Sequence, residues 1–148
     1  MLTEEKIAQF TDILREELIP AMGCTEPISI AYATAKARDA LGETPLRGEL
    51  SVSGNILKNA KSVTVPHTGG LRGIKSAFSA GLVAGDCEAC LEVLSCVKED
   101  QLKEIAKVRD EFDLKMYTPE DARIFDIGVT LYGKEHSVSR PDWSTAHR

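Results

Sequence analysis

The sequence has no apolar stretch long enough to cross a membrane, since none approaches the roughly 18 uncharged apolar residues that a span needs. The N-terminus reads Met-Leu-Thr-Glu-Glu-Lys, so it also lacks the basic region followed by an apolar one that marks a secretion signal. Internal repeats and low-complexity segments are missing as well. We therefore expect a soluble protein of the cytoplasm.

Positive charge is too sparse to form a binding stripe. The 18 Lys and Arg residues are outnumbered by 23 Asp and Glu residues, which gives a formal net charge of -5 at pH 7. They are scattered along the chain, so there is no electrostatic footprint for nucleic acid or for a membrane of anionic lipid. We expect neither as a partner.

Cysteine is scarce too, with four residues in a chain of 148. That number is too small for a disulfide scaffold, and without a secretion signal the four side chains are expected to be reduced thiols or metal ligands. The length fits one ordinary domain. We expect that domain over residues 1–140 and a disordered tail over 141–148, where no periodicity is left.

Two helical patterns flank the short run 23–27, Gly-Cys-Thr-Glu-Pro. Thr3 is placed to cap the first helix, whose apolar residues recur at helical spacing and predict a core-facing helix: Ile7, Phe10, Leu14 and Leu18. After a turn at Pro20 and Gly23, the second helix restarts at Thr25, which is the candidate cap residue. Its many alanines favour a helix that packs closely against a neighbour until Gly42 ends it.

The rest of the chain mixes strand and helix patterns. Residues 46–53 alternate as a half-buried strand does, and residues 63–65 are β-branched. Helical patterns occupy 71–85, 87–97 and 101–112, and further strands are expected at 114–117, 125–132 and 136–139, the last two as a hairpin. This order predicts an α+β fold with a mixed sheet of about four short strands and four or five helices.

Cys24 is the first candidate for chemistry because it stands where a helix begins. Free N–H groups and the positive end of the helix dipole favour thiolate over thiol, which makes a better base, nucleophile or metal ligand. Glu26 opposes this, since its negative charge raises the pKa of the thiol, and activation then needs a cation or a metal from elsewhere. The alternative is a small buried hydrophobic residue.

Cys87 and Cys90 form a second candidate, because residues three apart lie on one face of a helix. Cys96 follows them. A zinc site needs a second pair or histidines at ligand spacing, and a thioredoxin-like site needs a βαβ setting, so packing of the thiols within a helix is the alternative interpretation.

The stretch 55–70 carries amides, Lys58 and a glycine-rich turn before a helix. Such a turn presents backbone N–H groups to an anion, and the carboxylate of a substrate would fit there. The alternative is that Gly69 and Gly70 only allow the chain to turn and that Lys58 is solvated.

Two of these stretches together resemble a known family. The run 20–29, Pro-Ala-Met-Gly-Cys-Thr-Glu-Pro-Ile-Ser, resembles the N-terminal signature of the iron-sulfur L-cysteine desulfidases of the serine-dehydratase-like superfamily. The run 55–59, Asn-Ile-Leu-Lys-Asn, and the run 63–69, Val-Thr-Val-Pro-His-Thr-Gly, resemble its second motif at the expected separation. Residues 91–94, Leu-Glu-Val-Leu, also align with the sequences of that family.

The resemblance implies a lyase that breaks L-cysteine down to pyruvate, ammonia and sulfide with a [4Fe-4S] cluster. Cys24 would be the catalytic cysteine. The amino-acid substrate would be held by five further residues, assigned from the chemistry of amides, ammonium and hydroxyl groups and of the glycine-rich turn: Asn55, Lys58, Asn59, Thr68 and Gly69.

The chain departs from that family in length. Family members are roughly three times as long and bind the cluster with cysteines of a C-terminal half that has no counterpart here. We therefore expect an N-terminal part with no metal ligands of its own, inactive without a cluster-bearing domain or subunit, and able to form an oligomer. The alternatives are an L-serine dehydratase-like subunit and a non-catalytic metal or redox module that uses Cys87, Cys90 and Cys96.

Overall fold

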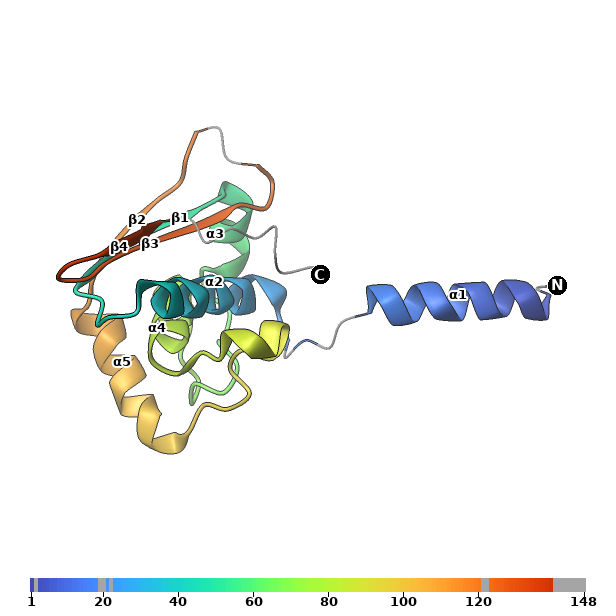
Figure 1. Ribbon diagram of the computed structural model, residues 1–148, viewed down its shortest axis with the longest axis horizontal. Coiled ribbons are helices and arrows are strands. Elements are labelled where there is room, and N and C mark those ends of the chain that lie inside the picture. The colour runs from blue at the N-terminus through green and yellow to red at the C-terminus, as the bar shows by residue number, and fades with distance from the viewer. Residues whose placement is uncertain (2, 19–20, 22, 121–122, 140–148) are drawn as a thin grey trace.

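A computed structural model describes residues 1, 3–18, 21, 23–120 and 123–139. Most of them form two layers, a sheet and the helices that cover one of its faces (Figure 1). The elements in chain order are α1 (Glu4–Glu17), α2 (Thr25–Leu41), β1 (Arg47–Val52), α3 (Gly54–Ala60), α4 (Ile74–Ala84), η1 (Cys87–Glu92), η2 (Glu99–Gln101), α5 (Leu102–Glu111), β2 (Asp113–Tyr117), β3 (Ile127–Tyr132) and β4 (Ser137–Ser139). The expected α+β fold with a four-stranded mixed sheet is confirmed.

The sheet has the order β2-β1-β3-β4, so the earliest strand lies inside it. β1 pairs in parallel with β2 and antiparallel with β3, and β3 and β4 form the expected hairpin. Opposite residues of an antiparallel pair share a face. The buried pairs between β1 and β3 are therefore the inner face, which packs on the helices: Gly48 with Leu131, Leu50 with Val129, and Val52 with Ile127.

Gly48 leaves space for two aromatic rings on that inner face. A Cβ atom at this position would lie 3.3 Å from both Phe78 of α4 and Phe112, which follows α5. The centroids of the two rings lie 5.7 Å apart, within the range of a favourable aromatic pair. A glycine in mid-strand thus fixes where α4 and α5 meet the sheet.

α2 and α4 pack backbone against backbone, as the alanine-rich sequence predicts. A Cβ atom on Gly81 would collide with the carbonyl oxygen of Ala31, and one on Gly85 would lie 2.7 Å from the Cβ of Ala35. One turn further along α2, the guanidinium of Arg38 donates hydrogen bonds to three carbonyl oxygens at the end of α4, those of residues 81, 82 and 85. These carbonyls carry the negative end of the helix dipole, so a cation stabilises them.

The prediction that the first helix faces the core is wrong. The helix itself is present, and Thr3 caps it by accepting a hydrogen bond from the backbone N–H of Lys6 at 3.4 Å. None of its residues is buried, however, and it stands apart from the two layers (Figure 1). An apolar stripe shows that a helix needs a partner, but it does not show that the same domain supplies one.

Two shorter predictions also need correction. Residues 63–65 form an isolated bridge between Thr64 and Arg72 instead of a strand, because the loop folds back on itself and not onto the sheet. Residues 87–97 are not one α-helix: η1 is a 3-10 segment, and Cys90 breaks it with φ 49°. Cys87 and Cys90 therefore do not share the face of a regular helix.

Within the described part of the chain, no helix is both long enough and apolar enough to cross a membrane. The predicted tail over 141–148 lies outside the described residues, and so does Pro20 in the first motif.

Candidate functional site

Cys24 is the N-cap residue of α2, and it is exposed. The sequence predicted a thiol at the start of this helix, although with Thr25 as the cap. Gly23 before it has φ +121°, a conformation that side chains rarely adopt, and a Cβ atom there would lie 3.7 Å from the ring of Pro66. The turn that presents the thiol thus requires glycine and lies against the second motif.

Hydrogen bonds connect the thiol to α3. The Cys24 thiol donates to Oε2 of Glu26 at 2.9 Å, and Nδ2 of Asn59 donates to Oε1 of the same carboxylate at 3.2 Å. Glu26 therefore bridges the two sequence motifs, through a contact between residues that are 33 positions apart along the chain. The sequence identified Glu26 only as a charge that opposes activation of the thiol, and not as the link between the motifs.

The carboxylate sets the protonation of the thiol. The hydrogen bond to Glu26 and, to a smaller extent, desolvation raise the pKa of Cys24 above its ordinary value. The same hydrogen bond from Cys24 lowers the pKa of Glu26, and the amide of Asn59 adds to this effect. At neutral pH the resting pair is therefore a protonated thiol beside an ionised carboxylate, in the direction that the sequence predicted for the thiol.

Three of the predicted substrate-binding residues lie on α3. Asn55, Lys58 and Asn59 are all exposed, and their spacing places them on one side of the helix. Because Asn59 is bonded to Glu26, this side of α3 lies next to the thiol. The structure thus brings Cys24 together with the first part of the second motif.

Thr68 and Gly69 have a different position, inside a tight loop. The hydroxyl of Thr68 is buried and donates to the carbonyl oxygen of Val65 at 2.7 Å. His67 and Gly69 both have positive φ, at 58° and 66°, so the loop turns twice in the left-handed region. Thr68 and Gly69 thus stabilise the conformation of the loop whose Pro66 lies next to Gly23.

The other cysteines lie elsewhere. Burial raises the pKa of the Cys87 thiol to about 11, together with its hydrogen bond to Oδ2 of Asp39 at 3.2 Å. Cys90 and Cys96 are exposed. No group of three His, Cys, Asp or Glu side chains arranged to hold a metal ion is found among the described residues.

An open hollow of about 700 Å³ lies at the other end of α2 and does not include the thiol. Its walls come from the C-terminal part of α2, from α4 and from α5, and they include Arg38, Leu82 and Phe112. The guanidinium of Arg38 is already bound to carbonyl oxygens and to Asp39. Nothing in the hollow points to a ligand, so the exposed surface around Cys24 remains the candidate site.

Fold and site together define a two-layer α+β domain that presents a hydrogen-bonded thiol and carboxylate on an open surface. The chain is similar over most of its length to proteins named UPF0597 protein. It is 45% identical over 129 residues to the one from Desulfitobacterium hafniense, 47% over 130 residues to that of Finegoldia magna and 42% over 136 residues to that of Fusobacterium nucleatum.

These matches cover 87%, 87% and 91% of this chain but only 30%, 31% and 32% of the three relatives. The chain thus spans about a third of the length of the curated relatives it matches. No family model and no solved structure matches it.

The prediction that this chain belongs to the L-cysteine desulfidase family is therefore wrong. The proteins that match nearly the whole chain carry the name UPF0597 protein and no activity in that name. The two short motifs specify a thiol at a helix start and a turn beside it, which is a local geometry, and local geometry does not define a family.

Proposed function

We propose that this chain is the N-terminal part of a cytoplasmic lyase that catalyses β-elimination from L-cysteine, giving pyruvate, ammonia and sulfide. The observation that carries the proposal is the connected set of Cys24, Glu26 and Asn59 on an exposed surface. A thiol and a carboxylate that share one proton can serve as base and acid in turn, which an elimination requires.

The proton steps balance within this pair. When the ammonium group of the amino-acid substrate brings positive charge to the site, the thiol proton passes to Glu26, and the Cys24 thiolate removes the α-proton of the substrate. The electron pair of that C–H bond forms the Cα=Cβ double bond as the Cβ–S bond breaks. The leaving sulfide takes the proton from Glu26, and water hydrolyses the aminoacrylate to pyruvate and ammonia.

The exposed side of α3 gives the substrate its contacts in this proposal. Lys58 pairs with the substrate carboxylate, and Asn55 and Asn59 offer amides to its polar groups. Thr68 and Gly69 act through the shape of their loop, because the Thr68 hydroxyl is already bound to the backbone. The chain alone is inactive in this proposal, and its open surface contributes to this, since water is not excluded from the thiol.

The described residues of this chain do not fit a [4Fe-4S] cluster. Such a cluster is held by several cysteine thiolates. Here the thiol of Cys24 is hydrogen-bonded to Glu26 and that of Cys87 to Asp39. Among the described residues, no three His, Cys, Asp or Glu side chains are arranged to hold a metal ion. In this proposal the ligands of a cluster come from a further domain or subunit, and no step above depends on it.

The test uses a full-length chimera in which this chain replaces the matched 129 residues of the Desulfitobacterium hafniense protein. After anaerobic reconstitution with iron and sulfide, the chimera is assayed with L-cysteine for pyruvate and sulfide and with L-serine for pyruvate. We expect release from L-cysteine and none from the isolated chain. Cys24→Ser should lower the rate by about 10²–10⁴-fold, the usual contribution of a general base, while Cys96→Ser retains it.

Two results would contradict the proposal. One is full activity of Cys24→Ser, and the other is a folded, cluster-loaded chimera that releases no pyruvate from either amino acid. Pyruvate from L-serine alone would replace L-cysteine by L-serine as the substrate and support the dehydratase alternative.

A further inference from the structure

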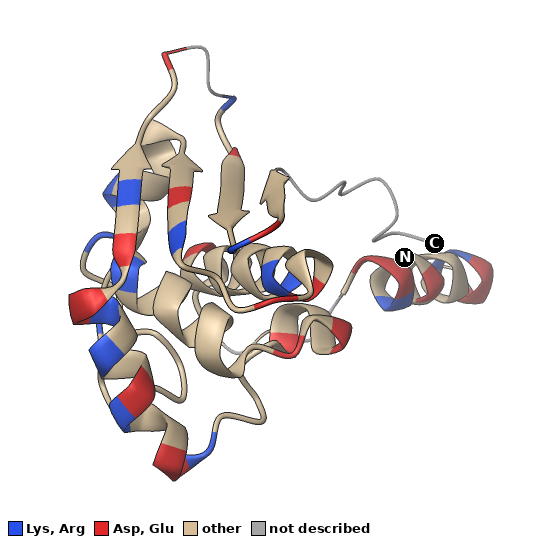
Figure 2. Cartoon of the chain, turned by 60° about the vertical axis from the view of Figure 1, so that its left-hand side comes forward, with Lys and Arg blue, Asp and Glu red and all other residues tan. Residues whose placement is uncertain are grey.

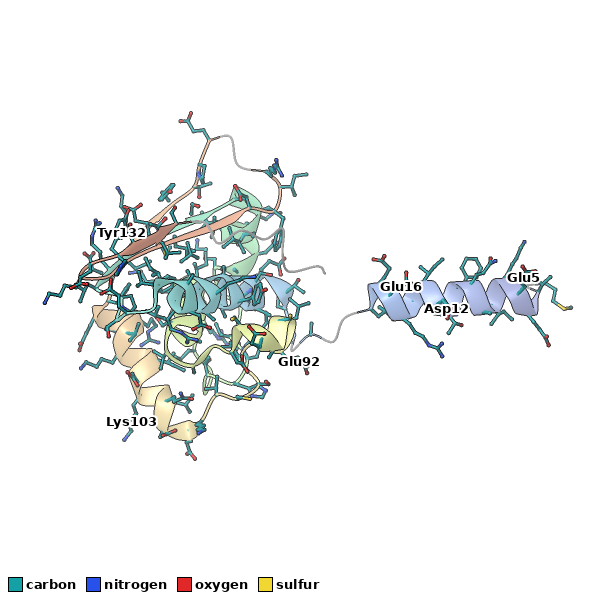
Figure 3. All side chains as sticks on the ribbon, viewed as in Figure 1. Glu5, Asp12, Glu16, Glu92, Lys103 and Tyr132 are labelled. Carbon is teal, nitrogen blue, oxygen red and sulfur yellow. The ribbon has the colours of Figure 1, made fainter. Side chains whose placement is uncertain are left out.

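α1 presents an apolar face that nothing in the described structure covers. Five large apolar side chains on or next to it are half to two-thirds exposed, at fractions from 50% to 69%: Ile7, Phe10, Ile13, Leu14 and Leu18. Their spacing places them on one side of the helix, with Ala8 on the opposite side. In Figure 3 the side chains of α1 project into open space along its whole length.

An apolar stripe of this size has an energetic reason to be covered. Covering the exposed half or more of each of these side chains would remove apolar surface from water, which is favourable. An isolated helix of 14 residues is also marginal in water without a partner to pack on. Packing of α1 against an apolar surface would therefore stabilise the helix.

A second copy of this chain is a poor match for that surface. α1 carries five acidic residues and two basic ones, and its acidic character is visible in Figure 2. Two such helices repel each other. They would also meet along a strip of about 20 Å by 10 Å, about a quarter of the roughly 800 Å² per partner in a stable interface. The hollow at the end of α2 is rimmed by Asp39, Glu43 and Glu104, and it would repel α1 as well.

The relatives point to another occupant. The match with the Fusobacterium nucleatum protein covers 91% of this chain, so it reaches into α1, yet it covers only 32% of that protein. At least the C-terminal end of α1 is thus shared with a protein in which a much longer polypeptide is present. A segment of the same polypeptide needs little contact area, because its effective concentration is high.

We propose that the apolar face of α1 docks into an apolar groove, edged by basic side chains, on the polypeptide that forms the other two-thirds of the longer relatives. The mode is a helix in a groove, with Phe10 and Leu14 as central anchors. Leu18 is only six residues from Cys24, so the docked polypeptide lies within about 20 Å of the thiol. The docking of α1 does not depend on the lyase reaction.

The test places a photoreactive benzoylphenylalanine at Phe10 in the chimera described above, and in a matched control at Ala8 on the opposite side. After irradiation, mass spectrometry identifies the cross-linked peptides. We expect a cross-link within one molecule from position 10 to the Desulfitobacterium part, at least severalfold stronger than from position 8. Cross-linking to a second molecule, equal yields from both positions, or no cross-link from position 10 would overturn the proposal.

Hydrogen exchange on the intact Fusobacterium nucleatum protein gives a second measurement that does not depend on the folding of the chimera. The residues aligned with Leu14 and its neighbours should exchange at least about tenfold more slowly than the same part of α1 in this chain alone. Equal exchange in the two proteins would also overturn the proposal. Neither experiment measures enzyme activity, so both can test the docking of α1 even if the proposed lyase function fails its own test.

Discussion

Glu26 has two opposite effects on Cys24. Its hydrogen bond holds the thiol in a fixed place, and the same bond raises the pKa of that thiol, which keeps it protonated at rest. A cysteine at a helix N-terminus is usually expected to be an acidic thiol. Here the carboxylate two residues later outweighs the helix dipole, because it touches the sulfur directly.

Removing the charge should therefore activate the thiol. We expect Glu26→Gln to lower the pKa of Cys24 and to increase its rate of alkylation by iodoacetamide at pH 7–8, because only the thiolate reacts. Peptide mapping by mass spectrometry measures the rate at each cysteine separately.

Asp39→Asn is the matched control for this experiment. It removes the carboxylate that bonds to Cys87 and should accelerate alkylation of Cys87 without changing Cys24. An unchanged Cys24 rate in Glu26→Gln would show that the carboxylate does not control the thiol.

At the scale of elements, the contact between α2 and α4 depends on the absence of side chains. Gly81 lies so close to Ala31 that a single methyl group would meet the backbone of α2. Backbone atoms cannot swing aside as the end of a flexible side chain can, so the helices themselves would have to move apart.

We expect Gly81→Ala to destabilise the chain by about 1–3 kcal/mol in urea unfolding, although alanine is the better helix former. Gly54→Ala is the control, since nothing lies within 4 Å of a Cβ atom there. It should change the free energy of unfolding by no more than about 0.5 kcal/mol. A stable Gly81→Ala variant would mean that α2 and α4 are not in backbone contact.

The elements that the sequence predicts well are those whose pattern is local. The alanines of α2 and the alternation in β1 both lead to the observed helix and strand. The pattern at 63–65 fails, because β-branched residues favour an extended chain but do not say which strand pairs with it. The link from Glu26 to Asn59 is also a tertiary contact, so only the type of each residue could be predicted.

For α1 the sequence gives the helix and its apolar stripe correctly but not its neighbour. The same stripe would be seen in a helix that covers its own domain and in one that waits for another.

At the scale of the molecule, α1 should contribute little to the stability of the isolated chain. It buries none of its residues, so deletion of residues 1–18 should leave the urea midpoint of the remainder unchanged. Circular dichroism and amide hydrogen exchange can follow the unfolding of both the whole chain and the chain without residues 1–18. A loss of about 1 kcal/mol or more on deletion would show that α1 packs on the two layers.

The position of β1 inside the sheet has a consequence for synthesis on the ribosome. Arg47 in β1 pairs with Asp113 and with Tyr132, so both neighbours of this strand are made long after it. Until then the nascent chain carries a central strand with both edges unpaired, which is a hazard for aggregation. Contacts between such distant residues also form slowly. The sheet can be completed only when the residues up to Ser139 have left the ribosome, so the edges of β1 stay unpaired while most of this region is being made.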